Sequence, residues 1–435
     1  SLDQESTETL TLRSCYTCKK RYRQLHHFYA QLCPDCAVVN FKKRCQAADL
    51  CSRVFLVTGA RVKIGFQVCV KLLRCGATVV ATSRFPADAA SRFAALEDFE
   101  TWRTRISVFG IDFRDLAAIE RFCGWMHSTL PRLDGLINNA CQTIRRPAAY
   151  YAHLIEHECD PSTHSPAVRA LLQQHAKCFG PADQSLAAGG LAGRRISSRR
   201  PSSSTCSPLE GSQPPQMDLV PHDSAAVRSV IPSALWSQAP LWSAQEGVMQ
   251  PDDGGGSDFP IGRLDVNQQQ IDTRRTNSWL LKLHQVSTAE AAEVLAINTL
   301  APFILNGRLR ELIERSPAAA KFVVNVSAME GKFYRYKTPN HPHTNMAKAA
   351  LNMMTRTCAD ELATHAIFMN SVDTGWINDE KPLEKAAAHA EQHHFQTPLD
   401  EIDAAARILD PVLSVVNGAD PLYGKFFKDY NVSEW

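Results

Sequence analysis

Residues 54–65, which read VFLVTGARVKIG, decide the fold of this protein. Val54–Thr58 is a run of mostly apolar, β-branched residues and predicts a buried strand. Helical periodicity over Arg61–Leu73 follows at once, and Gly76 is placed to end that helix. A glycine-containing turn between a strand and a helix presents free N–H groups and the positive helix end to a diphosphate. The stretch therefore predicts a nucleotide site in an α/β unit.

The alternation of strands and helices continues on both sides of a long interruption. Before it, the pattern predicts strands at 78–82, 106–111 and 133–138, and helices at 88–104 and 116–126. After it, a capping box at Ser287 and Glu290 opens a helix through about Leu312. Further strands are predicted at 322–326, 367–372 and 423–428, and further helices at 344–365 and 399–416. The predicted fold class is therefore α/β, a doubly wound parallel sheet of the Rossmann type.

The interruption, residues 150–287, shows no α/β pattern. Residues 179–264 are rich in Gly, Pro, Ser and Ala, and the stretches 199–216 and 251–257 are of low complexity. Such stretches bury too little apolar surface to offset the entropy of ordering them. We interpret the block as an insertion into one domain.

Three segments of the insertion have residue patterns that indicate structure or contacts. Short helices are predicted at 150–157 and 166–179, and two tryptophans in 235–242 suit an anchor to the body or to a partner. The predicted organisation is a module at residues 1–50 followed by one interrupted Rossmann domain over 51–435.

Composition excludes several classes of protein. The 435 residues carry 47 Lys+Arg against 45 Asp+Glu, a net charge of +2 that rules out a bulk polycation and an acidic solvating tail. No apolar run approaches the roughly 18 residues that a membrane span needs. Ser1–Leu12 is polar and acidic and lacks the layout of a signal peptide.

Four of the fourteen cysteines are spaced as metal ligands. They form two knuckles, Cys15-x2-Cys18 and Cys33-x2-Cys36, a spacing that predicts one structural zinc held by four thiolates rather than a pair of disulfides. His26 and His27 lie between the knuckles, either as substitute ligands or as packing residues. The other ten cysteines show no paired spacing and are interpreted as free thiols. Together they indicate a reducing compartment, either cytoplasm or an organelle matrix.

The segment around the knuckles is basic. Residues 13–53 hold nine Lys and Arg side chains against Asp35 and Asp49, a net charge of +7 that four zinc-bound thiolates partly offset. This charge fits either an acidic or phosphate-rich partner, protein or RNA, or a solvated face.

The turn after the first strand resembles that of the short-chain dehydrogenase/reductase family, TGxxxGIG. Gly59, Ile64 and Gly65 match, whereas Lys63 stands where the family has its middle glycine. Lys63 either hinders close approach of the backbone to a pyrophosphate or, together with Arg61, adds cationic contacts to it. The resemblance covers residues 52–147 and about 288–435 and implies a nicotinamide dinucleotide as cofactor.

The resemblance assigns further residues to the cofactor. The second strand ends in Ser83 and Arg84 with no carboxylate for a ribose 2′-hydroxyl, which favours NADP over NAD unless Arg84 is only a surface residue. Asp112 corresponds to the residue that meets the adenine. Asn139 and Ala140 match the family's NNAG, with cysteine at position 141 in place of its glycine.

Near the C-terminus, residues 370–376 resemble the family's N-x-V-x-P-G loop beside the nicotinamide. Gly375 matches the glycine of that loop, and Thr374 replaces its proline.

The family's catalytic set is incomplete here. The family transfers a hydride with a tyrosine as proton donor, a lysine four residues later that also binds the ribose of the cofactor, a serine and an asparagine. Asn298 and Lys348 correspond to the asparagine and the lysine, but Thr344 stands at the tyrosine position and Ala328 at the serine position. Ser327 lies one residue early and would face the other side of its strand. His343 is the best substitute acid among the neighbouring residues.

Two functions follow from these residues. The first is an NADP-dependent oxidoreductase of this family whose activity is either altered or, in a pseudoenzyme, lost. The chain is then either a monomer or a homo-oligomer. The alternative is a non-catalytic structural or scaffold subunit of a larger protein or ribonucleoprotein assembly.

Overall fold

The computed structural model describes residues 8–180, 233–239, 258–334, 336–378, 380–386, 391 and 396–435. By their contacts the residues divide into two compact units, one formed by Ser1–Cys178 with Pro232–Trp435 and the other by Phe179–Ile231. All the contacts discussed below lie within the first unit. The predicted low-complexity stretches 199–216 and 251–257, and the second tryptophan of 235–242, lie outside the described residues.

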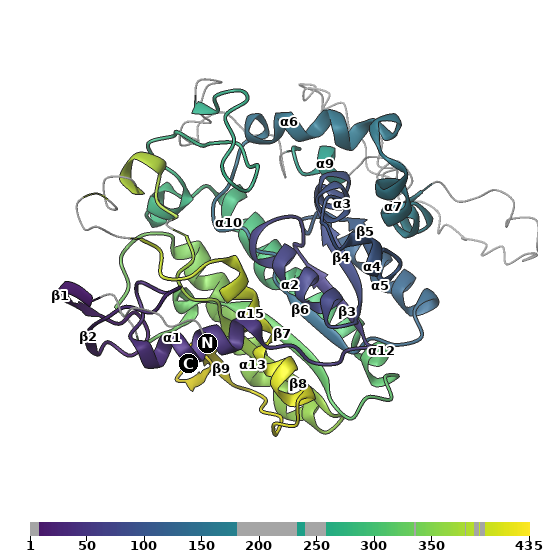
Figure 1. Cartoon of the computed structure of the whole chain (residues 1–435). Coiled ribbons are helices and arrows are strands. Elements are labelled where there is room, and N and C mark those ends of the chain that lie inside the picture. Colours follow the sequence, from purple (N-terminus) through teal and green to yellow (C-terminus); the bar gives the residue numbers. More distant parts are fainter. Residues whose placement is uncertain are drawn as a thin grey trace, which may run out of the picture. The chain divides into compact units, whose positions relative to one another are not determined.

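An eight-stranded sheet forms the centre of the first unit (Figure 1). Its order is β10-β9-β8-β7-β6-β3-β4-β5, and all neighbours are parallel except β9 and β10. The chain winds outward from β3 to β5 and then returns to β6 on the other side, so the predicted doubly wound α/β fold is confirmed. The strands are β3 (Val54–Thr58), β4 (Thr78–Ser83), β5 (Ile106–Gly110), β6 (Gly135–Asn138), β7 (Lys321–Ser327), β8 (Ile367–Asp373), β9 (Phe426–Lys428) and β10 (Asn431–Ser433).

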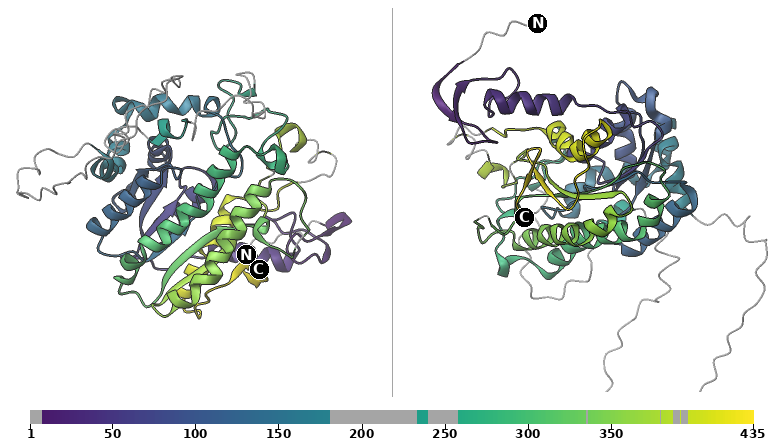
Figure 2. Two further views of the ribbon diagram at one scale, coloured as in Figure 1. Left: turned by 180° about the vertical axis from the view of Figure 1, so that it is seen from behind. Right: turned by 90° about the horizontal axis from the view of Figure 1, so that it is seen from below.

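Helices cover both faces of the sheet, as the views from opposite sides show (Figures 1 and 2). On one face lie α2 (Lys63–Arg74), α3 (Pro86–Ala94) and α15 (Glu401–Val416), whose apolar residues join those of the strands in one core. On the other lie α5 (Leu116–Thr129), α11 (Ala301–Arg308) and α13 (Pro342–Ala363). Because the sheet is covered twice, all seven residues of β7 are buried.

The predicted helix 88–104 is wrong at its centre. It is divided into α3 and α4 (Phe99–Trp102), with a 3-10 turn at Arg103–Arg105. In a continuous helix, Phe93 and Phe99 would lie on different sides, since six residues turn the helix by about 240°. The break after α3 lets both rings enter the core beside Trp102, and the Phe99 and Trp102 rings meet edge to face at 5.3 Å.

The predicted helix from Ser287 to Leu312 is also interrupted. It consists of α10 (Thr288–Leu295), a π-turn at Ala296–Leu300, α11, and α12 (Arg310–Glu314). Pro302 has no N–H to donate to the carbonyl four residues earlier, which explains the widened turn before it. Only half of the capping box forms, because Ser287 accepts the Glu290 N–H while the Glu290 carboxylate turns inward.

The run Thr288–Arg308 is long and apolar enough by composition to cross a membrane. It contacts α5 and α13, and Val294, Asn298 and Leu305 within it are buried. Core helices of globular domains have the same composition, so this run does not indicate a membrane protein.

The N-terminal module consists of β1 (Glu8–Ser14), β2 (Arg21–Gln24) and α1 (Pro34–Cys45). Although it is far from α15 in sequence, α1 lies beside that helix in both views (Figures 1 and 2). Arg44 pairs with Asp400 at 2.6 Å and with Asp403 at 3.0 Å, and Lys43 pairs with Asp410. Part of the basic charge around the knuckles is therefore neutralised inside the protein.

Candidate nucleotide and metal sites

A cavity of about 710 Å³ opens at the carboxyl ends of β3, β4, β5 and β6. This is where the winding direction of the sheet reverses, the usual ligand position in such folds. All but two of the residues predicted to bind the cofactor line it, the exceptions being Lys348 and Gly375. The predicted residues that line the cavity are Gly59, Arg61, Lys63, Ile64, Gly65, Ser83, Arg84, Asp112, Asn139 and Ala140.

The turn between β3 and α2 has the shape that its glycines require. Gly59 has a φ of +70°, and a Cβ on Gly65 would lie 2.2 Å from the Gly59 carbonyl oxygen. Asn139 holds the turn from the neighbouring strand by donating to the carbonyls of Thr58 and Gly59 at 3.0 and 3.1 Å. Lys63 also has a positive φ, +52°, so it keeps the backbone conformation of the glycine it replaces.

The cations of the cavity are not equally available. Arg61 pairs with Asp88 at 2.9 Å and donates to Gln269 at 3.0 Å, so its guanidinium is already engaged. Arg84 donates to the Tyr151 hydroxyl at 2.9 Å. Lys63 makes no ion pair with any residue in the described part of the chain, which leaves its ammonium group as the readiest phosphate contact.

The carboxylate of Asp112 is already bound. It forms a buried ion pair at 2.8 Å with Arg114, which also reaches Glu293 at 3.0 Å. Its side chain is therefore part of a buried charge network at the edge of the cavity.

Parts of the predicted insertion form one side of the cavity, which sequence reasoning missed. Tyr150, Tyr151 and residues from 265–277 line it, together with Arg146, which lies just before the insertion. Arg146 and Arg274 both pair with Asp272. The mixture of arginines and aromatic residues in these stretches was the available signal. Their place beside β3 and β4 is set by contacts between residues far apart in the chain.

Helix α6 (Ala148–Cys159) also fastens this side to the body. The carboxylate of Glu158 accepts the backbone N–H groups of Ala87 and Asp88 at 3.0 and 2.8 Å, so it caps α3. Burial raises the pKa of Glu158 to about 7 despite these two donors. The predicted short helices are confirmed as α6 and α7 (Pro166–Phe179).

Asn298 and Lys348, which match the asparagine and lysine of the family's catalytic set, are both held by backbone groups. Asn298 accepts the Gln142 N–H at 2.8 Å and donates to the Gln142 carbonyl at 3.1 Å. Lys348 is buried and donates to the Val326 carbonyl at 2.7 Å. Neither lines the cavity described above, which ends at Ile297 on this side.

Of the two positions at which the sequence departs from the family's expected catalytic residues, Thr344 is buried and Ala328 is partly exposed. Thr344 is 2% exposed, and its hydroxyl has no hydrogen-bond partner among the described residues. Ser327 donates to Asn352 at 2.6 Å, which agrees with the prediction that it faces away from Ala328.

His343 was the predicted substitute acid. Its Nε2 lies 3.5 Å from the carboxylate of Glu290, and both side chains are buried. Glu290 lines a second cavity of about 570 Å³ that also includes Arg145 and Asn277. His343 lines neither of the two cavities, whereas Glu290 lines the second one, which shares Arg274 and Asn277 with the nucleotide cavity.

The glycine loop after β8 contacts the N-terminal module. Gly375 has a φ of +80° and donates its N–H to Asp373 at 2.7 Å. The next residue, Trp376, donates its N–H to the Tyr16 hydroxyl at 2.9 Å. Ile377 and Asn378 then line the nucleotide cavity.

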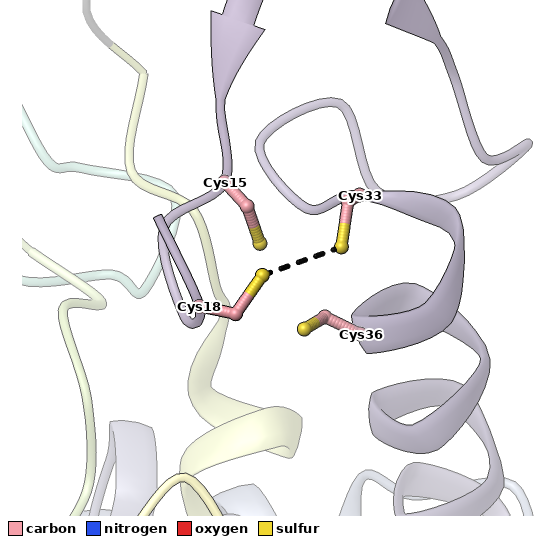
Figure 3. A group of neighbouring side chains, drawn as sticks. All are labelled: Cys15, Cys18, Cys33 and Cys36. Atoms are coloured by element: carbon pink, nitrogen blue, oxygen red, sulfur yellow. Dashed lines mark hydrogen bonds between the residues drawn. The ribbon is translucent and has the colours of Figure 1, made fainter. Parts of the chain in front are cut away.

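The four predicted metal ligands meet at one point (Figure 3). The Sγ atoms of Cys15, Cys18, Cys33 and Cys36 lie within 4.8 Å of one another, and those of Cys18 and Cys33 are 3.6 Å apart. Four thiolates at about 2.3 Å from a tetrahedral zinc stand roughly 3.8 Å apart, whereas a disulfide needs about 2.05 Å. His26 is occupied in its own turn, where Nδ1 accepts the Phe28 N–H at 3.1 Å. The sulfur positions therefore fit a four-thiolate metal site.

Comparison with known families gives matches on both sides of the insertion. A family model described as short chain dehydrogenase matches residues 53–154, and one described as enoyl-(acyl carrier protein) reductase matches residues 261–418. An uncharacterized protein of Acanthamoeba polyphaga mimivirus is 26% identical over 416 residues, covering 92% of this chain and 72% of that protein. A (-)-isopiperitenone reductase of Mentha piperita is 34% identical over 89 residues, covering 20% of this chain and 28% of the reductase.

Similar solved structures include a mutant short-chain dehydrogenase/reductase of Serratia marcescens, 12% identical, with a TM-score of 0.48 over 87% of this chain and 96% of that one. RhlG of Pseudomonas aeruginosa in an NADP active-site complex is 16% identical, with a TM-score of 0.43 over 83% of this chain and 90% of that one.

Proposed function

This chain belongs to the short-chain dehydrogenase/reductase family, and from that premise we propose that it binds NADP(H) in the 710 Å³ cavity without the family's usual proton transfer. The observation that carries the proposal is the cavity itself. It combines a strained glycine-type turn, a Lys63 that has no ion-pair partner among the described residues, and the end of β4 without a carboxylate. When bound, the nicotinamide would supply or accept a hydride.

Preference for NADP over NAD is assigned to Arg84. Its guanidinium lies at the end of β4, where a 2′-phosphate would stand, and among the described residues its hydrogen bond goes to the neutral hydroxyl of Tyr151. A phosphate is a stronger acceptor than a phenol, because charge-assisted hydrogen bonds are about twice as strong as neutral ones. Arg84 would therefore exchange Tyr151 for the phosphate.

Loss of the usual chemistry follows from the side chains at the catalytic positions. An aliphatic hydroxyl such as that of Thr344 is too weak an acid to protonate a carbonyl oxygen, and Ala328 offers no hydroxyl to orient one. Lys348 and Asn298 donate to backbone carbonyls, and Thr344 leaves no phenol at the position that the family's lysine would activate. The alternative function, a scaffold subunit, needs the same inert site but no nucleotide.

The module is proposed to hold one structural zinc through Cys15, Cys18, Cys33 and Cys36. All four positions are thiolates, which leaves no open coordination site for catalysis. Metal analysis of the purified protein should give one zinc per chain, and the Cys18→Ser and Cys36→Ser variants should lose it.

Binding is tested by titrating the protein with NADPH and NADH and following nucleotide fluorescence. Arg84→Ala should raise the Kd for NADPH about tenfold and leave that for NADH unchanged, since one buried charge-assisted bond contributes roughly 1.5 kcal/mol. Tyr151→Phe is the matched control: it frees Arg84 and should not weaken NADPH binding. Absence of NADPH binding to the unaltered protein would refute the nucleotide function and leave the scaffold function.

Catalysis is tested by following NADPH consumption with a panel of aldehydes and ketones. We expect no consumption above the rate without protein. Turnover that is abolished by Lys348→Ala would show that the family's lysine is active and would overturn the second half of the proposal.

A further inference from the structure

We propose that the four-cysteine module, when it holds its metal, fixes one wall of the nucleotide cavity, with Tyr16 as the positioning residue. The inference rests on the proposed binding of zinc and of NADP(H), and it adds that NADP(H) binding depends on the bound zinc. It is carried by one continuous path of contacts from the knuckles to the cavity.

The path begins inside the first knuckle. Tyr16 follows Cys15 directly, and its N–H donates to the Gln31 carbonyl at 2.9 Å, just before the second knuckle. The turn is closed by the Cys15 N–H, which donates to the Lys20 carbonyl at 2.9 Å. The position of Tyr16 therefore depends on the two knuckles being held together.

The path continues at the glycine loop after β8. The Tyr16 hydroxyl accepts the N–H of Trp376 at 2.9 Å, a contact between residues 360 positions apart. A Cβ on Gly375 would lie 3.4 Å from that hydroxyl and 2.6 Å from Leu399, and the φ of +80° already favours glycine. The loop is thus shaped to lie closely against the module.

The path ends at the cavity. Ile377 packs against the apolar core of the module, which includes Cys15, Leu32 and Leu399. Ile377 and Asn378 line the nucleotide cavity, and so does the segment 380–383 that follows. One side of the loop therefore contacts the metal module while the other side faces the ligand space.

Metal loss would act on the knuckles rather than on the whole module. Helix α1 stays attached to α15 through the ion pairs of Arg44 with Asp400 and Asp403, none of which involves a ligand. The knuckles have only a small core of their own, and modules of this size depend on their metal for folding. Without metal, Tyr16 would lose its fixed position while the docking of α1 persists.

The experiment measures hydrogen–deuterium exchange of peptides covering residues 374–378 and the Kd for NADPH, in zinc-loaded protein, in protein stripped by a chelator, and in Tyr16→Phe. The variant removes only the hydroxyl and should retain zinc. We expect exchange at Trp376 to rise, and the Kd for NADPH to increase roughly 3- to 10-fold, in both altered forms, the range expected for one lost hydrogen bond.

Tyr22→Phe is the matched control, since the Tyr22 hydroxyl donates to the Ala30 carbonyl within the same module at 2.7 Å and has no hydrogen bond to the loop among the described residues. It should leave exchange at Trp376 and the Kd unchanged. Unchanged exchange in both Tyr16→Phe and the stripped protein would overturn the inference. If the unaltered protein bound no NADPH, the proposed function would fail, whereas the exchange measurement would still decide whether the module holds the loop.

Discussion

Lys63 offers the sharpest test of how this protein holds a dinucleotide, because two properties of the residue oppose each other. Its φ of +52° is a left-handed conformation that glycine adopts freely and that lysine adopts at a cost. Its ammonium group lines the cavity and pairs with no charged residue in the described part of the chain. We therefore predict that Lys63→Gly stabilises the fold and weakens nucleotide binding at the same time.

The two magnitudes follow from the backbone and from the charge. Left-handed backbone costs a non-glycine residue about 1–2 kcal/mol, and glycine loses about 0.5–1 kcal/mol more entropy on folding. The net gain in unfolding free energy for Lys63→Gly is then about 0.5–1 kcal/mol. A half-exposed lysine–phosphate pair contributes about 1 kcal/mol, so the Kd for NADPH should rise roughly fivefold.

Two controls separate strain from charge. Lys63→Ala removes the ammonium group but keeps the strain, so it should raise the Kd equally with no gain in stability. Ala366→Gly relieves a second left-handed residue, with φ +55°, at the end of the sheet opposite the cavity. It should add similar stability and leave the Kd unchanged.

The assay combines urea unfolding midpoints with NADPH titrations at two salt concentrations, where both Lys63 variants should show a weaker salt dependence. Tighter NADPH binding by Lys63→Gly but not by Lys63→Ala would refute the reasoning, because it would mean that the side chain blocks the approach of the pyrophosphate. A loss of stability in Lys63→Gly relative to Lys63→Ala would refute the strain argument.

Two further predictions concern the walls of the cavity. Burial raises the pKa of Glu158 from its ordinary 4.5 to about 7, so the folded protein binds more protons than the unfolded chain between these values, and the stability that Glu158 contributes is lost as pH rises from about 4.5 to 7. The unfolding free energy of Glu158→Gln, measured in urea, should fall by up to about 3 kcal/mol less than that of the parent over this pH range. Parallel pH profiles of the variant and the parent would contradict the prediction. Gly65→Ala would place a Cβ 2.2 Å from the Gly59 carbonyl oxygen. It should lower the unfolding free energy by about 3 kcal/mol or more and abolish NADPH binding. Gly124→Ala, at a helical position with nothing within 4 Å, is the control and should be neutral or slightly stabilising.

Much of the fold could be predicted because its signals are local. The strands at 54–58, 78–82 and 367–372 were found within one residue, since continuous apolar runs are typical of strands buried on both faces. The helix 88–104 was placed wrongly because a break that buries two aromatic rings leaves no change in local composition. The π-turn before Pro302 was missed for a similar reason, as a proline within a helical pattern indicates a disturbance but not its form.

By itself, the sequence determined the doubly wound sheet, the glycine turn and the four-cysteine cluster. Each depends on periodicity or on ligand spacing within a few tens of residues, and such short-range geometry is set by the backbone. Only the tertiary structure decided which cations of the cavity are engaged, since Arg61 is bound by Asp88 and Gln269 while Lys63 forms no ion pair within the described residues. It also brought the loop at Trp376 to Tyr16, 360 positions away. Such contacts arise from packing, which follows from the shapes of many elements together. They therefore cannot be predicted from a single stretch of sequence.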